Sequence, residues 1–209
     1  MSKGTILYLR TDITDQELTA GGSVAHTLGV INGFCELGYE VVCGSSCLGS
    51  VLDKAELKEF IRLSNPSWLK FLRWKLNSFL SSFFFFFQLK KIVKKYEIVC
   101  IYQRYSLLNM TGILLAWWYK KKLVLEYNGS ETWVDIHWAK KKRLISGTTM
   151  INSIEYINIR CADYMVVVSE VLYDELVKRG IQSDKILVNP NGVDPFLFDS
   201  EKLKRECVS

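Results

Sequence analysis

Several features that would mark a specialised class of protein are missing from this 209-residue sequence. With three prolines and 49% hydrophobic residues, it is not typical of a disordered chain. Its six cysteines form no C-x-x-C pair and its two histidines lie far apart, so we expect reduced thiols and no structural metal. The dinucleotide pattern G-x-G-x-x-G and the Gly-Lys-Ser/Thr phosphate loop are both absent. A zinc protein and these two nucleotide-binding classes are therefore not expected.

The sequence also lacks a signal-peptide pattern at its N-terminus and a long charge-free apolar helix. Residues 1–10 run directly into a strand-like segment without the apolar stretch of a secretory signal, which predicts a cytoplasmic protein. The uncharged runs at 76–89 and 105–119 contain 14 and 15 residues, whereas a membrane-spanning helix needs about 20. We therefore expect neither segment to span a membrane.

Apolar runs of strand length recur along the chain, at residues 5–9, 40–43, 98–102, 123–127, 164–168 and 185–188. Such runs suit strands that are buried on both faces. Helical patterns lie between them, one ending near Gly38 and one beginning after Ser169 and ending before Gly180. This alternation predicts an α/β fold with a Rossmann-like, doubly wound and mostly parallel sheet flanked by helices.

A glycine-rich turn follows the first expected strand and precedes a helix. Gly21, Gly22 and Ser23 would lie at the carboxyl end of that strand, where doubly wound sheets bind ligands. Backbone N–H groups of the helix N-terminus would suit a phosphate or sugar, and His26 would lie one turn further on. Two plainer interpretations stay open: a flexible turn with Ser23 as the N-cap, and a packed or solvated His26.

Taken in order, these segments resemble the retaining, nucleotide-sugar-dependent glycosyltransferase family 4, which has the GT-B fold. The resemblance begins with Gly-Gly-Ser-Val-Ala-His at 21–26 and Leu-Gly-Tyr-Glu-Val-Val at 37–42, where Tyr39 replaces the usual His. It continues with the strand ending at Ser169 and with Asn-Pro-Asn-Gly-Val-Asp at 189–194. The matching segments bracket nearly the whole chain.

This resemblance implies that the chain is half of a two-domain enzyme. Residues 1–195 would form the N-terminal, acceptor-side domain, and residues 196–209 the start of a linker or tail. The donor-binding domain, with its phosphate-binding Arg and Lys and its Glu-x7-Glu pair, would be absent. The resemblance implies sugar transfer from a nucleotide sugar to a glycan or lipid-linked acceptor, in cell-envelope or polysaccharide biosynthesis. Activity would require the C-terminal donor domain or a partner chain, and no cofactor or metal is implied.

The resemblance also suggests where substrates bind, although it assigns no catalytic residue. Gly21 and Gly22 match a loop near the donor phosphate and the reacting sugar, and Ser23 and His26 follow it. The loop after residues 123–127 lacks the His that the family often has there, but it offers polar groups. The expected substrate-binding residues are Gly21, Gly22, Ser23, His26, Asn128, Gly129, Glu131, Asn191, Gly192 and Asp194. For Asn128, Gly129 and Glu131, a tight turn and a helix cap are equally open, and Ser169 is expected to be an N-cap.

Positive charge is concentrated in one aromatic segment. The net charge is +5, yet residues 60–96 hold eight basic residues and no acidic one, so the rest sums to 5 − 8 = −3. Residues 67–96 lack Gly and Pro and are expected to form one long helix, which includes five consecutive phenylalanines. Such a helix can lie on an anionic membrane at the inner leaflet. The expected membrane-facing residues are Trp68, Trp74, Phe84, Lys90 and Lys94.

Two alternatives to that membrane role stay open. The aromatic face of the segment can instead pack on the sheet, with the lysines as a solvated rim. A binding module without catalysis, which docks on a membrane or a partner subunit, is the alternative function. Nucleic-acid binding is not expected, since the phenylalanines are contiguous and not spread over strands as stacking platforms.

Overall fold

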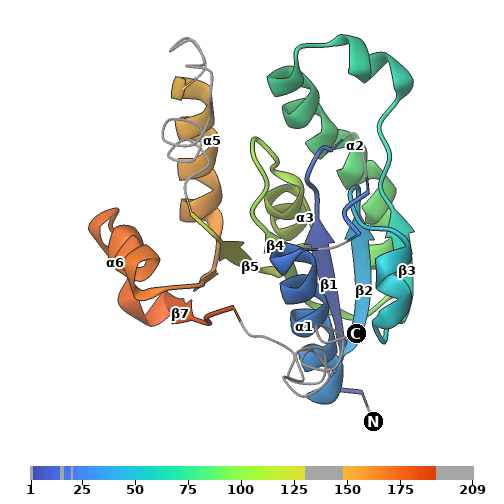
Figure 1. Cartoon of the computed structure of the whole chain (residues 1–209), viewed down its shortest axis with the longest axis horizontal. Helices are drawn as coiled ribbons and strands as arrows, with labels where there is room; N and C mark the ends of the chain where they lie inside the picture. The colour runs from blue at the N-terminus through green and yellow to red at the C-terminus, as the bar shows by residue number, and fades with distance from the viewer. Residues whose placement is uncertain (1, 15–16, 20, 130–147, 192–209) are drawn as a thin grey trace, which may run out of the picture.

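The computed structural model describes residues 2–14, 17–19, 21–129 and 148–191. Seven parallel strands form one sheet in the order β3-β2-β1-β4-β5-β6-β7 (Figure 1). The bounds are Thr5–Arg10 (β1), Glu40–Ser45 (β2), Glu59–Arg62 (β3), Ile98–Arg104 (β4), Lys122–Tyr127 (β5), Tyr164–Val167 (β6) and Ile186–Val188 (β7). The order reverses between β1 and β4, which is the point where doubly wound sheets bind ligands.

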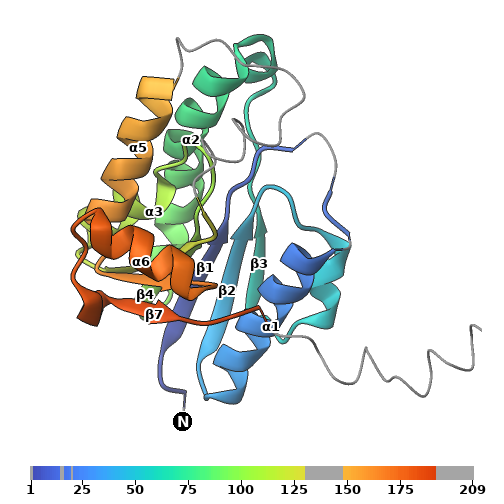
Figure 2. The same ribbon diagram turned by 60° about the vertical axis from the view of Figure 1, so that its left-hand side comes forward.

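Helices cover both faces of this sheet (Figure 2). Helix α1 (Gly22–Glu36) and the short 3-10 helix η1 (Ser50–Lys54) pack on one face around Tyr8, Val41 and Tyr102. Helices α2 (Trp74–Lys95), α3 (Thr111–Tyr119), α5 (Thr148–Cys161) and α6 (Glu170–Lys178) lie on the other. The strands are apolar on both faces because both are covered. The expected Rossmann-like, doubly wound sheet is confirmed, and all the described strands are parallel.

Most of the expected elements are present, with one strand in addition. Strand β3 pairs with β2 at the edge of the sheet, and its residues alternate between half-buried and exposed. Its sequence, Glu-Phe-Ile-Arg, lacks the apolar run that marks the inner strands. Ser169 is the N-cap of α6, with its hydroxyl accepting from Leu172 N, as expected.

The expectation of one uninterrupted helix over residues 67–96 is wrong. A 3-10 helix, η2 (Ser67–Phe71), comes first, and Leu72 and Arg73 then take extended conformations before α2 begins at Trp74. The change of direction places Leu69 fully inside the core, while Phe71 stays 90% exposed. Local helix propensity is therefore overridden here by tertiary packing. Among the described helices, none has the length and apolar character needed to cross a bilayer.

Candidate functional site

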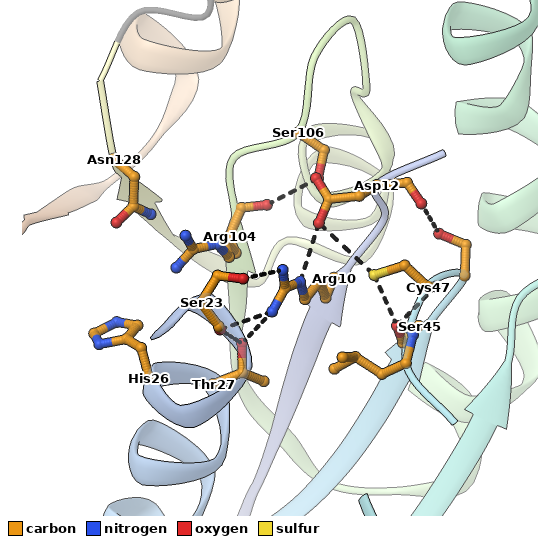
Figure 3. A network of polar contacts seen from close by, with 12 residues as sticks. Arg10, Asp12, Ser23, His26, Thr27, Ser45, Cys47, Arg104, Ser106 and Asn128 are labelled. Atoms are coloured by element: carbon orange, nitrogen blue, oxygen red, sulfur yellow. Dashed lines mark hydrogen bonds and ion pairs between the residues drawn. The ribbon is translucent and has the colours of Figure 1, made fainter. Parts of the chain in front are cut away.

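A polar cavity of about 350 Å³ opens at the carboxyl ends of β1, β4 and β5. Figure 3 shows the polar side chains in and around it. These strand ends lie beside the N-terminus of α1, at the point where the strand order reverses. The lining residues are Arg10, Asp12, Ile13, Thr14, Leu18, Arg104, Tyr105, Asn128 and Gly129.

Arg10, the last residue of β1, ties this strand to the start of α1. Its Nη1 donates to Ser23 O at 2.8 Å and to Thr27 Oγ1 at 2.9 Å, and its Nη2 donates to Ser23 Oγ at 3.1 Å. Its Nε donates to Asp12 Oδ2 at 3.0 Å. Burial alone would lower the pKa of this 3%-exposed guanidinium, but the Asp12 charge and hydrogen bond raise it. Arg10 therefore stays charged and fixes the position of α1 relative to the cavity.

Asp12 extends the same network to the end of β2. Ser46 Oγ donates to Asp12 O at 2.8 Å, and Cys47 Sγ lies 3.7 Å from Asp12 Oδ2. Burial and the neighbouring carboxylate raise the pKa of the Cys47 thiol, which keeps it protonated. Cys47 is therefore a packed hydrogen-bonding group and not a reactive thiolate.

A second charged cluster centres on Glu126, a fully buried carboxylate near the end of β5. Tyr102 donates to its Oε2 at 2.9 Å, Asn128 Nδ2 donates to its Oε1 at 2.8 Å, and Arg104 Nη1 is in close contact with Oε1. His26 Nε2 lies 3.2 Å from Oε1, an ion-pair distance, although the ring is not aligned for a regular hydrogen bond.

The protonation of Glu126 is set by opposing effects. Burial would raise its pKa, but the contact with His26, the Arg104 charge and the Asn128 hydrogen bond lower it to about 2. Glu126 is therefore ionised at neutral pH. It holds Arg104 and Asn128, two residues that line the cavity, in place.

The N-terminus of α1 has no side-chain cap. Gly21 is the N-cap residue, with φ 106° and ψ 163°. A Cβ atom built on Gly21 or on Gly22 would meet no atom within 4 Å. The first N–H groups of a helix have no acceptor inside the helix. Val24 N already donates to Gly21 O at 3.0 Å, so the donors that the exposed glycines leave open to a ligand are the N–H groups of Gly22 and Ser23.

The structure brings only some of the expected substrate-binding residues together. Asn128 and Gly129 line the cavity, and Ser23 is hydrogen-bonded to the lining residue Arg10. Gly21 and Gly22 directly precede Ser23 but do not line the cavity. His26 is buried against Glu126, so the packed alternative describes it best. Ser23 is not the N-cap, because Gly21 takes that position. Asn191 is exposed and does not line the cavity, and Glu131, Gly192 and Asp194 lie outside the described residues.

Four charged residues of the site were missed by the sequence reasoning: Arg10, Asp12, Arg104 and Glu126. A signal was nevertheless present, since Arg10 and Arg104 come directly at the ends of buried strands. Glu126 is a single carboxylate inside the apolar run 123–127. Charged residues at these places meet at one edge of a parallel sheet, where burial requires that they be paired.

This arrangement suits the binding of a polar, hydroxyl-rich ligand. Guanidinium, carboxylate and amide groups surround the cavity, and each can hydrogen-bond a sugar hydroxyl. Each arginine already has a carboxylate partner, so the side chains around the cavity carry little net charge. In the described part of the chain, no three His, Cys, Asp or Glu side chains are grouped as metal ligands would be.

Comparison with known proteins gives a family and a fold. A family model described as Glycosyltransferase Family 4 matches residues 20–196. No curated protein sequence matches the chain significantly.

Solved structures resemble this chain over almost its full length. A glycosyltransferase from Rickettsia africae ESF-5 is 24% identical with a TM-score of 0.59, and the match covers 99% of this chain and 49% of that one. UDP-GlcNAc 2-epimerase from Neisseria meningitidis, bound to UDP-GlcNAc, is 14% identical with a TM-score of 0.64, and the match covers 98% of this chain and 51% of that one. Anabaena Alr3699/HepE, in complex with UDP-glucose, is 15% identical with a TM-score of 0.61, and the match covers 98% of this chain and 50% of that one. These likenesses show the fold, that of one half of a GT-B protein, and the chain spans about half the length of these structures.

Proposed function

The chain belongs to glycosyltransferase family 4, and on this basis we propose that it is the acceptor-side domain of a sugar-transferring enzyme. The donor would be a nucleotide sugar, and the acceptor a glycan or lipid-linked sugar in cell-envelope or polysaccharide assembly. The observation that carries this proposal is the polar cavity between the ends of β1, β4 and β5, next to the uncapped N-terminus of α1.

The cavity offers binding and orientation to an acceptor. Asn128 and Arg104 are held by Glu126, so their remaining hydrogen-bonding groups are pre-oriented toward sugar hydroxyls. Pre-oriented groups of this kind lower the cost of ordering a substrate for attack. We propose that these two residues position the acceptor sugar.

The α1 N-terminus suits the charge that develops on a departing diphosphate. Backbone N–H groups and the helix dipole stabilise an anion without a metal or a protein nucleophile. Gly21 and Gly22 leave room for the donor to approach the backbone. We propose transfer with retention of configuration and with no metal or other cofactor.

We propose that a donor-binding domain, in the same polypeptide or in a partner chain, completes the site. The chain spans about half the length of its structural neighbours. Two of those neighbours were solved with UDP-GlcNAc or UDP-glucose, which favours a uridine diphosphate sugar as donor. Without the second domain, we expect no sugar transfer.

The test is reconstitution with a domain that carries the donor motifs of the family. Released nucleoside diphosphate and transferred sugar are measured together, with wild-type chain, Asn128→Ala and the exposed control Lys178→Gln. We expect transfer with the wild type and the control, and a several-fold higher acceptor KM with Asn128→Ala. Failure to detect either sugar transfer or nucleotide-sugar hydrolysis with suitable donor domains would argue against the proposal.

A second candidate is a non-catalytic module that binds a membrane or a partner subunit. The large aromatic side chains exposed on α2 and α3 favour it. The reconstitution experiment distinguishes the two candidate functions, since a non-catalytic module would bind its partner without release of nucleoside diphosphate. We also propose a peripheral position at the inner face of a membrane, which is compatible with either candidate.

A further inference from the structure

The outer surface of α2 and α3 carries a group of exposed aromatic rings. Trp117 is 75% exposed, Trp118 62%, Phe87 57% and Phe83 40%. The half-buried Phe86 connects Phe87 with Trp118, since its ring centroid lies 5.4 Å from that of Phe87 and 6.0 Å from that of Trp118. Phe83 precedes Phe87 by four residues and so lies on the same side of α2. Trp117 and Trp118 are 6.1 Å apart. We call these five residues the aromatic patch.

The aromatic patch is mounted on two helices that are firmly joined. On the inner side of α2, Phe85 and Leu89 are fully buried against the sheet. Tyr119 at the end of α3 donates a hydrogen bond to Lys90 O of α2 at 3.2 Å. Helices α2 and α3 lie side by side in both views (Figures 1 and 2). The rings are therefore held outward by packed elements and do not belong to a loop.

The charge around the aromatic patch has one sign. Residues 60–125 contain twelve basic residues and a single acidic one, Glu97. Four of the twelve have an acidic partner outside this range: Arg62, Lys95, Arg104 and Lys122. Five other lysines, in the last two turns of α2 and just after α3, have no ion pair within the described residues: Lys90, Lys91, Lys94, Lys120 and Lys121. Lys90 Nζ lies 5.0 Å from the Phe87 ring centroid, which places a cation directly at the patch.

This combination fits a lipid surface better than a protein partner. The buried centres of protein interfaces are depleted in lysine and favour arginine as the cation. At a membrane, lysine stems can lie along apolar surface while their charges reach the lipid phosphates, and tryptophan prefers the headgroup region. We propose that the aromatic patch docks reversibly on an anionic lipid bilayer, with its rings in the headgroup region and the five lysines against lipid phosphates.

The docking surface differs from the one expected from sequence. Phe84 is half-buried and packs edge-on against Trp68, with ring centroids 5.9 Å apart. Trp68 and Trp74 are exposed, but they lie in and beside η2, before the main length of α2. The contribution of Trp117 and Trp118 comes from α3, which the sequence reasoning did not associate with membranes.

The test is sedimentation of the full 209-residue chain with vesicles of phosphatidylcholine alone or with 30% phosphatidylglycerol. We expect binding only to the anionic vesicles, weakened at high salt. We expect the double substitution Lys90→Gln/Lys94→Gln to weaken binding about tenfold or more, because each lysine contributes roughly 1 kcal/mol at such a surface. The double substitution Trp117→Ser/Trp118→Ser should weaken it about as much, because it removes two rings that prefer the headgroup region. The matched controls, Tyr164→Ser at an exposed aromatic and Lys178→Gln at an exposed lysine, should bind as the wild type does.

Three outcomes would overturn this proposal. The first is a lack of binding to anionic vesicles. The second is binding that neither double substitution reduces, with circular dichroism confirming that both variants are folded. The third is concentration-dependent dimerisation abolished by Trp117→Ser/Trp118→Ser, which would make the patch an interface between copies. None of these outcomes bears on sugar transfer in the reconstitution, so the proposed function is tested separately.

Discussion

At the scale of single residues, the site depends on two buried charges, and Arg10 is the first of them. Replacing Arg10 by Met removes four hydrogen bonds and leaves the partly buried Asp12 carboxylate without its ion-pair partner. We expect the free energy of unfolding to fall by about 2–4 kcal/mol, less than for a fully buried pair because Asp12 is partly exposed. Urea denaturation with an unchanged m-value is the measurement.

A control for Arg10 is Arg73→Met, which changes an exposed arginine in the same way. We expect a change below about 0.5 kcal/mol there. Equal effects of the two substitutions would mean that the contacts of Arg10 with α1 contribute nothing specific to stability.

Glu126 is the second buried charge, and it makes stability depend on pH. Its pKa in the folded chain is about 2, below the usual 4.5, so ionised Glu126 favours folding at neutral pH. This contribution to the free energy of unfolding is roughly 3 kcal/mol. It is fully present above about pH 4.5 and is lost as the pH falls toward 2.

Glu126→Gln should therefore lower the free energy of unfolding at pH 7 but matter progressively less between pH 4.5 and 2. Urea denaturation of wild type and variant over this range measures the difference, with the exposed Glu36→Gln as control. A difference between wild type and Glu126→Gln that stays constant down to pH 2 would contradict the low pKa.

How far sequence predicts the site depends on the kind of residue. Glycines and Asn128 could be found, because they stand in recognisable turns after predicted strands. His26 and Glu126 could not be paired, since 100 residues separate them in sequence and only the sheet order brings α1 over β5. Long-range pairing of charges is a property of the tertiary structure, which local patterns do not report.

At the scale of secondary structure elements, the N-terminus of α1 carries the sharpest prediction. Gly22 is helical and a Cβ there would meet nothing, so Gly22→Ala should leave stability unchanged or raise it by up to about 1 kcal/mol. In the reconstituted enzyme, however, the methyl group would occupy space that the donor needs. We expect sugar transfer to fall at least about tenfold, measured by release of nucleoside diphosphate.

Gly29→Ala is the matched control, because Gly29 lies in the same helix with equally open space around it, but two turns from the N-terminus. It should give the same gain in stability and keep full activity. Similar activity of the two variants would show that no substrate approaches the α1 backbone closely.

The elements themselves were largely predictable because their signals are local. Apolar runs identified the inner strands, and Ser169 marked the start of α6. The edge strand β3 was missed since its exposed positions dilute the apolar signal. The break at Leu72 and Arg73 was missed for a different reason, since neither residue disfavours a helix. The segment before the break is held by tertiary contacts, the burial of Leu69 and the packing of Trp68 on Phe84.

At the scale of the whole molecule, charge is divided between two surfaces of different character. The cavity at the strand ends has its arginines matched by carboxylates, whereas α2 and α3 present lysines that have no acidic partner among the described residues, next to aromatic rings. The first suits a polar, hydroxyl-rich ligand and the second an anionic surface. A protein with both can remain at a membrane while it handles a sugar.

This division predicts how the chain binds a nucleotide sugar on its own. A donor carries two phosphates, but Arg10 and Arg104 are already neutralised, and the α1 N-terminus adds only about 0.3–1 kcal/mol for an anion. We therefore expect a Kd for UDP-glucose of about 1 mM or weaker, worth roughly −4 kcal/mol. Calorimetry with the 209-residue chain, and then with a donor domain added, measures both states. Binding should tighten strongly in the second titration, whereas micromolar binding by the chain alone would identify it as an independent nucleotide-binding protein.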